Sequence, residues 1–262
     1  MNEKQDFKDC VFDALLDYPN LLSNDFISTG IWQIDQALQG GIRRKELGTI
    51  LAQWQHGKST ILTIIGANCY IKGYKVLHLI LEDFWLDIQQ SYRNILKDNI
   101  EELVKGEFRY LRLVDCVSKT PKLWELEDLI NEYKPDVVII DYAELLQGSY
   151  KIGDTAKRHI LRENFIELRR LAGKTNTAIW TAHQASVVSG NSEQSTLRLT
   201  PDRISECRAI GATTDILVGF ALADPFDQLI YCSIMKAKHR TKPMPDYFKL
   251  AVDFSIPRVW SI

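Results

Sequence analysis

Along the chain, long apolar runs alternate with segments in which apolar residues recur at helical spacing. Four runs are typical of parallel strands that are buried on both faces, and they lie at 47–51, 75–82, 137–141 and 177–184. Between them come segments with apolar residues at helical spacing, which lie at 85–105, 122–133 and 160–172. Residues 108–115 alternate like a further strand. This order predicts an α/β fold, with a mainly parallel, twisted sheet flanked by helices.

The C-terminal part of the chain has a different pattern. Apolar and polar residues alternate there in segments joined by short turns, as in antiparallel strands, and these segments lie at 215–222, 229–240, 246–254 and 258–262. Before them, residues 186–203 are poor in apolar groups. Such a long stretch inside a compact domain is usually functional or disordered. The alternating segments that follow this stretch predict that the sheet ends in antiparallel C-terminal strands.

The N-terminal segment is set apart from the rest. Residues 6–17 have apolar side chains at helical spacing, which predicts an amphipathic helix that ends before Pro19. Its apolar stripe packs either on the same domain or on a neighbouring subunit, because periodicity does not identify the partner. We divide the chain into an N-terminal helix and linker, residues 1–25, and one domain, residues 26–262.

Composition narrows the class of protein only a little. A chain of 262 residues, 45% of them hydrophobic, can bury one large core. The five cysteines are scattered without a CxxC pair, so a disulfide framework is not expected. The chain has no secretory signal and no apolar run long enough for a bilayer, so we expect a cytoplasmic protein without membrane association. A net charge of −2 does not exclude nucleic-acid binding, because basic residues can be concentrated locally.

The candidate chemistry is centred on Gly57, Lys58, Ser59 and Thr60, which follow the first apolar run. They match the end of the phosphate-binding pattern GxxxxGK[ST]. In that pattern backbone N–H groups cradle phosphates, the lysine contacts the β/γ charge, and the hydroxyl binds Mg²⁺. An ordinary turn before an amphipathic helix is the alternative reading of so short a motif. The strand before the motif, and the helix and strand after it, favour a nucleotide site.

The next three apolar runs end in polar side chains that can share one edge of the sheet. Glu82 ends the second run, Asp141 the third, and His183 with Gln184 the fourth. Ligands bind at the carboxyl ends of strands in open α/β sheets, so these groups are candidates for phosphate and metal chemistry. Asp141 after VVII has the form of a Walker B aspartate, which holds the Mg²⁺ shell. The alternatives are that strand ends are charged because they meet water, and that His183 is structural.

The motifs together resemble one family. Their order is ISTGIWQIDQALQGGI, the GKS loop, LILE, VVIIDYAELL, TAHQ, DRISECRAIGATTDILVGF and IMKAKHRTKP. This order is similar to that of the ATPase domain of DnaB-type replicative helicases, a branch of the RecA-like motor proteins, over roughly residues 26–262. The resemblance implies a RecA-like fold, ATP and Mg²⁺ as cofactors, and hydrolysis of ATP.

The resemblance also implies roles for single residues. Ser59 and Asp141 would hold Mg²⁺, Glu82 would polarise the attacking water, and Gln184 would sense the γ-phosphate. The nucleotide would be bound at Ala52, His56, Gly57, Lys58, Ser59 and Thr60. Two residues depart from the family pattern, because Ala52 replaces the first glycine of the loop and Trp54 is bulky; either change is expected to alter nucleotide affinity or selectivity.

Lys238 and Arg240 stand where the family has a lysine and an arginine finger that reach the nucleotide of the neighbouring subunit. By this resemblance activity would depend on a homo-oligomer, a hexameric ring. The N-terminal helix, residues 6–17, stands where the family has a linker helix that docks on the adjacent subunit. From the residues alone, a solvated turn between two strands is the preferred interpretation of Lys238 and Arg240.

Two polar loops stand where the family contacts single-stranded DNA. Residues 147–158 and 186–203 contain basic side chains that can follow a phosphate backbone without reading its sequence. The candidates are Lys151, Lys157, Arg158, Arg198 and Arg203. The alternative is that both segments are solvated surface loops.

We therefore predict an ATP-driven translocase on single-stranded DNA, a minimal replicative helicase whose further partners include a primase or a helicase loader. Two other functions remain open. One is a RecA-like recombinase or a KaiC-like regulatory ATPase. The other is a degenerate family member that uses the fold as a ring-forming scaffold or loader. The presence of Lys58, Ser59, Glu82 and Asp141 argues against the degenerate form.

Overall fold

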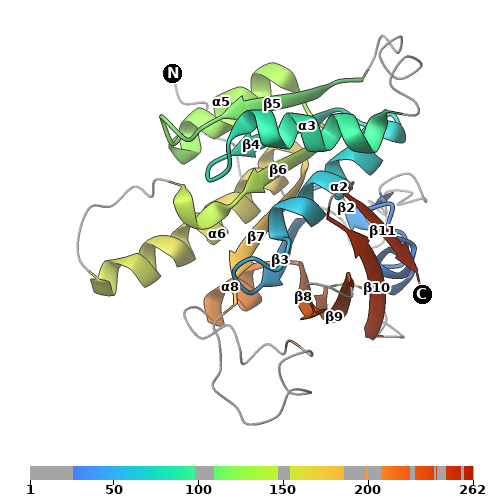
Figure 1. Ribbon diagram of the computed structural model, residues 1–262. Coiled ribbons are helices and arrows are strands. Elements are labelled where there is room, and N and C mark those ends of the chain that lie inside the picture. Colours follow the sequence, from blue (N-terminus) through green and yellow to red (C-terminus); the bar gives the residue numbers. More distant parts are fainter. Residues whose placement is uncertain are drawn as a thin grey trace, which may run out of the picture.

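The computed structural model describes residues 26–97, 109–146, 154–185, 199, 208–224, 228–238, 240, 246–254 and 257–261, of which 154–158, 208–209, 223–224 and 260–261 are described by their backbone alone. The helix predicted at 6–17 lies outside these residues. Figure 1 shows a large twisted sheet with helices on both sides. Within the described part, no helix is long and apolar enough to span a bilayer.

The large sheet confirms the predicted fold class. Its strand order is β11-β10-β9-β8-β3-β7-β6-β4-β5. The strands are β3 (Leu47–Ala52), β4 (Val76–Ile80), β5 (Leu111–Asp115), β6 (Val137–Asp141), β7 (Ala178–Gln184), β8 (Ile216–Asp224), β9 (Leu229–Ala237), β10 (Tyr247–Asp253) and β11 (Arg258–Ser261). Pairing is parallel from β8 through β3 to β5, and antiparallel from β8 to β11. The change of direction falls at the C-terminal strands, as the alternating pattern predicts.

Helices cover the two faces of this sheet. One face packs against α1 (Trp32–Ala37), α2 (Lys58–Ile71) and α3 (Trp85–Leu96). The other face packs against α5 (Leu123–Tyr133), α6 (Asp154–Thr175), α8 (Arg208–Thr213) and the 3-10 helix η3 (Ala143–Leu145). A two-stranded sheet of β1 (Phe26–Ile27) and β2 (Ile42–Arg43) completes the described elements.

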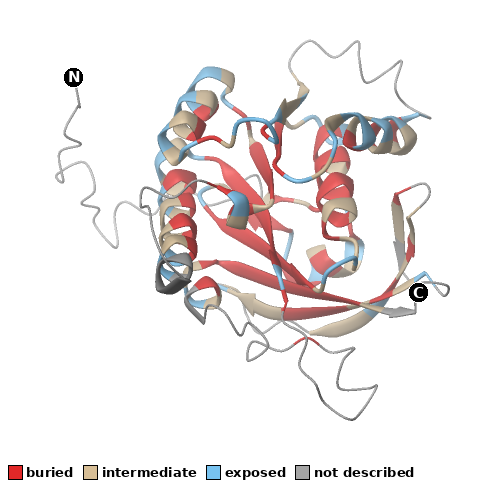
Figure 2. Cartoon of the chain, turned by 60° about the vertical axis from the view of Figure 1, so that its left-hand side comes forward, coloured by how far each residue is buried: buried red, intermediate tan, exposed pale blue. Residues whose placement is uncertain are grey.

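The central strands β3, β4, β6 and β7 are largely continuous apolar runs because both of their faces are buried. Successive residues of β6 alternate between the two cores: Ile139 belongs to the core on the α2 side and Ile140 to the core on the α6 side. Figure 2 shows these buried strands enclosed by helices that are exposed on their outer sides. Gly48 of β3 lies in register with Trp180 of β7, and a Cβ at Gly48 would lie 2.5 Å from that indole ring. The glycine therefore makes room for the largest side chain of the buried sheet.

One helix boundary corrects the prediction from sequence. We expected a loop over residues 147–158 and a helix from about residue 160, but α6 already begins at Asp154. Lys157 and Arg158 therefore belong to the first turns of a helix. The sequence from 154 to 158 has few apolar residues, so hydrophobic periodicity does not detect these turns.

Candidate nucleotide-binding site

The loop between β3 and α2 has the backbone of a phosphate-binding loop. Gly57 precedes the first residue of α2 and has a φ of 77°, in the left-handed region that favours glycine. A Cβ at Gly57 would also lie 2.6 Å from the ring of Phe254. The N-terminus of α2 therefore presents Lys58, Ser59 and their backbone N–H groups to any anion in front of it.

The two departures from the loop pattern fit this backbone. Ala52 is the last residue of β3 and is fully buried in the parallel ladder, so this position does not require a glycine. Trp54 is 63% exposed and lies at the edge of the pocket. Its indole therefore forms part of the wall of this pocket and stays largely accessible to solvent.

His56 ties the loop to the antiparallel part of the sheet. Its Nδ1 accepts a hydrogen bond from the backbone N–H of Leu222 at 3.1 Å. Burial lowers the pKa of His56, and the nearby charge of Lys58 lowers it further. We infer that a neutral imidazole holds the loop in place here.

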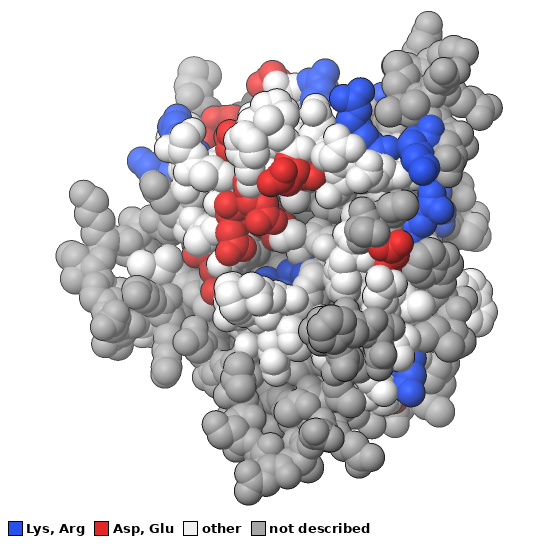
Figure 3. Space-filling view, in the orientation of Figure 1, with Lys and Arg blue, Asp and Glu red and all other residues white. Residues whose placement is uncertain are grey.

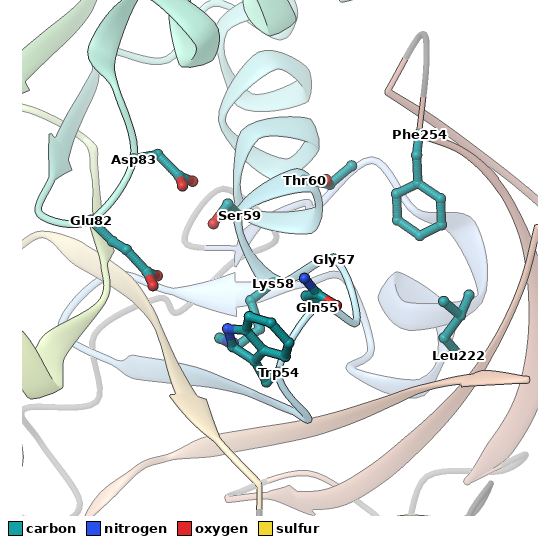
Figure 4. Close-up of a pocket in the computed structure, with 10 residues that line it drawn as sticks. All are labelled: Trp54, Gln55, Gly57, Lys58, Ser59, Thr60, Glu82, Asp83, Leu222 and Phe254. Carbon is teal, nitrogen blue, oxygen red and sulfur yellow. The ribbon is translucent and has the colours of Figure 1, made fainter. Parts of the chain in front are cut away.

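A cavity of about 440 Å³ opens in front of this loop, a size typical of ligand sites. Its lining comes from the loop, from the start of α2, from the segment after β4 and from the C-terminal strands (Figure 4). The lining residues are Trp54, Gln55, Gly57, Lys58, Ser59, Thr60, Glu82, Asp83, Leu222 and Phe254. The cavity brings together five residues that the sequence predicts for the site, Gly57, Lys58, Ser59, Thr60 and Glu82. Leu222 and Phe254 were not predicted.

The cavity is hollowed into the face of the molecule that Figure 3 presents, where acidic side chains gather beside a recessed basic one. Lys58 is largely buried, and its Nζ lies 5.7 Å from the ring centroid of Tyr142. This contact holds the ammonium group at the base of the cavity, opposite Glu82 and Asp83.

Asp141 is the last residue of β6 and is buried close to these groups. Burial raises its pKa to about 7; the Ser59 hydroxyl and Lys58 lower it, whereas Asp83 and Glu82 raise it. Ser59 is close enough to favour the carboxylate, but neither oxygen of Asp141 has a partner with full hydrogen-bonding geometry among the described residues. A buried carboxylate without such partners is suited to binding a cation.

The oxygen groups around Asp141 fit Mg²⁺. This cation prefers oxygen ligands and is commonly held by one or two carboxylates together with water and phosphate oxygens. The Ser59 hydroxyl and the carboxylate of Asp141 provide such ligands, while Glu82 and Asp83 face the same space. Among the described residues no cluster of three His, Cys, Asp or Glu side chains could hold a metal by itself. The chemistry of the site therefore fits an ion that is brought with a phosphate ligand.

The end of β7 contributes His183 and Gln184. His183 is buried and its Nδ1 contacts Oε1 of Glu144 in η3, while the backbone N–H of Gln184 donates to the same oxygen at 2.9 Å. The Gln184 side chain is exposed. Glu144 was not predicted from the sequence, because a glutamate in a polar turn carries no periodic signal. Its position three residues after Asp141 is the local feature that could have indicated a place near the site.

Lys238 and Arg240 lie in different environments. Lys238 has a side chain that is 46% exposed, with its Nζ 3.7 Å from Asp215 Oδ1. The Arg240 side chain is 0% exposed and donates to both oxygens of Glu46, at 2.9 and 2.8 Å, and to the carbonyls of Leu38, Gly41 and Lys238. All of its donor groups are used within its own chain, so this placement differs from that of a finger that reaches a neighbour.

The predicted DNA contacts are only partly described. Lys151, Arg198 and Arg203 lie outside the described residues. Lys157 and Arg158 belong to α6 by their backbone, and their side chains are not described. Their role in DNA binding stays a prediction.

Many solved structures are similar to this chain, and two of them illustrate the likeness. One is described as the ATPase domain of G40P, with a TM-score of 0.73 and 13% identity over 90% of this chain and 91% of the other. The second is a DnaB-like replicative helicase in a study of its interactions with primase, with a TM-score of 0.74 and 14% identity over 90% of this chain and 62% of the other. No protein-family model matches the chain, and no curated protein sequence matches it. At this identity the likeness shows the RecA-like fold, in agreement with the resemblance between the motifs.

Proposed function

We propose that this RecA-like chain is an ATP-driven translocase on single-stranded DNA that works as a ring in DNA replication. One observation carries the proposal: Lys58 and Ser59 at the start of α2 face Glu82 and Asp83 across one cavity. The buried carboxylate of Asp141 is close enough to interact with Ser59 and Lys58. This combination meets the needs of phosphoryl transfer, namely a phosphate cradle, a cation and a carboxylate for the attacking water. The two similar structures, an ATPase domain and a replicative helicase, support the choice of activity.

The residues of the site have different roles in the proposed hydrolysis. The N–H groups around Gly57 and the ammonium of Lys58 would bind the β- and γ-phosphates, and Ser59 and Asp141 would hold Mg²⁺. Bound Mg²⁺ would neutralise charge that develops on the phosphate oxygens. Glu82 is exposed at the cavity, so it can orient a water molecule and accept its proton. Gln184 would report the presence of the γ-phosphate from the end of β7.

The proposal includes a second copy of the chain. Lys238 is exposed and is therefore the better candidate for a cation offered to the neighbouring nucleotide. Arg240 can act as a finger only after its contacts with Glu46 break. Single-stranded DNA would be held by the basic residues of 147–158 and 186–203, and a primase or loader would be a further partner.

The first test measures ATP hydrolysis by the full chain with Mg²⁺, with and without single-stranded DNA. We expect DNA to stimulate hydrolysis and a forked duplex to be unwound. Lys58→Ala should abolish nucleotide binding and turnover, and Glu82→Gln should keep binding but reduce turnover by about a hundredfold or more. Lys119→Ala, which removes a lysine paired with Glu125 outside the cavity lining, is the control and should leave both unchanged.

Other results point to the other functions. Filament formation on DNA would favour a recombinase, and hydrolysis that ignores DNA would favour a regulatory ATPase. Absence of hydrolysis in an assembly that still forms would favour a scaffold or loader. Full turnover by Glu82→Gln would remove Glu82 from the role of base.

A further inference from the structure

Glu144 occupies a position that the proposed hydrolysis does not yet use. It lies in η3, directly after the strand that ends at Asp141. One of its oxygens, Oε1, contacts both the imidazole of His183 and the backbone N–H of Gln184. A single carboxylate oxygen therefore holds two successive residues at the end of β7.

The backbone that carries Glu144 is fixed from two sides. The N–H of Ala143 donates to the Thr181 hydroxyl at 3.0 Å, and this hydroxyl donates to the carbonyl of Ile140 at 2.9 Å. From α6, the side-chain amide of Asn164 donates to the carbonyl of Leu146 at 3.1 Å. Hydrogen bonds from two strands and one helix, β6, β7 and α6, thus hold η3 in place. The position of Glu144 is therefore set by rigid elements.

The electrostatic surroundings keep Glu144 ionised. Burial alone would raise its pKa, but the hydrogen bond and charge of His183, the N–H of Gln184 and the charge of Lys58 outweigh burial and lower it. Lys58 therefore acts on Glu144, although Glu144 does not belong to the lining of the nucleotide cavity. We therefore expect Glu144 to influence the site without contacting a bound nucleotide.

We propose that Glu144 is a positioning residue, which holds His183 and the end of β7 so that the Gln184 side chain faces the γ-phosphate. This inference rests on the proposed function. A sensor that acts on the reacting phosphate affects turnover more than ground-state binding. Loss of Glu144 should therefore lower kcat and leave the affinity for nucleotide nearly unchanged.

The test is a double-mutant cycle in the full chain with Mg-ATP. We expect Glu144→Ala and Gln184→Ala each to lower kcat by at least about tenfold, because small displacements of a catalytic group are costly. The double variant should lose no more than either single variant, since Glu144 would act only through Gln184. The Kd for a non-hydrolysable ATP analogue should stay within about twofold in all three.

Conservative variants separate positioning from folding. Glu144→Gln keeps an oxygen acceptor at the same reach and should retain most of the wild-type kcat. Glu144→Asp keeps the charge but withdraws it by one methylene, so its kcat should fall between those of wild type and Glu144→Ala. Glu144→Asp also takes the place of Glu144→Ala in the cycle if the alanine variant does not fold.

Glu125 supplies a matched control. It also accepts a backbone N–H, from Lys122 at 2.8 Å, and pairs with a lysine, Lys119, at 3.3 Å, but it lies at the start of α5. Glu125→Ala should leave kcat unchanged. Additive losses in the cycle would show that Glu144 acts independently of Gln184 and would overturn the positioning role. A rise in Kd that accompanies a lower Tm would show that Glu144 is only structural. Absence of hydrolysis by the wild type would overturn the proposed function itself, and this inference with it.

Discussion

Arg240 shows how one side chain can join distant parts of the sequence. Its guanidinium bonds to Glu46, which is almost fully buried, and lies 5.6 Å from the ring centroid of Phe26. Arg43 lies over the same ring at 4.7 Å. The turn after β9 is thereby fastened to the start of the domain. The sequence alone could not distinguish this buried pair from an exposed finger, because both need the same residue type.

At this scale we predict that Arg240→Ala lowers the free energy of unfolding by about 3–5 kcal/mol, because it leaves Glu46 buried without its charged partner. Arg240→Lys should recover only part of the loss, since an ammonium cannot reproduce the bidentate geometry. Urea unfolding followed by circular dichroism measures the effect. Lys238→Ala is the control and should cost less than about 1 kcal/mol, because that pair is partly exposed. Equal stability of wild type and Arg240→Ala would contradict the enclosed position.

At the scale of elements, β4 and α3 share a polar contact inside the core. His78 of β4 is fully buried, and its Nδ1 lies 2.8 Å from the hydroxyl of Tyr92 in α3. Gly66 of α2 gives this hydroxyl room, since a Cβ there would lie 2.3 Å from it. Burial lowers the pKa of His78 to about 3. The imidazole is therefore neutral in the folded protein.

This neutral histidine should make stability depend on pH. Below its ordinary pKa of 6.5 the unfolded chain binds a proton at His78 that the folded protein does not bind until about pH 3. The contribution of His78 to stability is therefore complete above pH 6.5 and is lost as the pH falls through this window. When the pH is lowered from 7.5 to 5, the unfolding free energy of the wild type should fall by about 2 kcal/mol more than that of His78→Gln. A difference that does not change with pH would contradict this assignment.

At the scale of the whole molecule, the proposed ring would need Lys238 of one copy to reach the nucleotide site that contains Glu82 of the next. We predict that Glu82→Gln and Lys238→Ala are each inactive as pure assemblies. Mixed assemblies should recover part of the DNA-stimulated hydrolysis, because some interfaces then combine an intact Glu82 with an intact Lys238. The measurement is ATP turnover over a range of mixing ratios, with native mass spectrometry to show that mixed assemblies form. No recovery in assemblies that do mix would rule out action of Lys238 across the interface.

The sequence predicted well what depends on short-range pattern. The apolar runs of β3, β6 and β7 were found because both of their faces are buried, and Lys58 and Ser59 were found because a phosphate loop needs a fixed spacing. The first turns of α6, the whole of α8 and the partners of Glu144 were not found. Short helical segments with few apolar residues carry no apolar period, and a hydrogen bond between η3 and β7 joins residues that are distant in the chain.

By itself, the sequence determined the α/β class, the parallel core with antiparallel C-terminal strands and the order of the chemical groups along the chain. These follow from local periodicity and from the rule that parallel strands present their carboxyl ends at one edge. Only the tertiary structure decided which groups meet. It enclosed Arg240 with Glu46, left Lys238 exposed, buried Asp141 without full hydrogen bonds and brought Glu144 to Gln184. Burial and pairing of charges depend on long-range packing, which residue type and spacing do not contain.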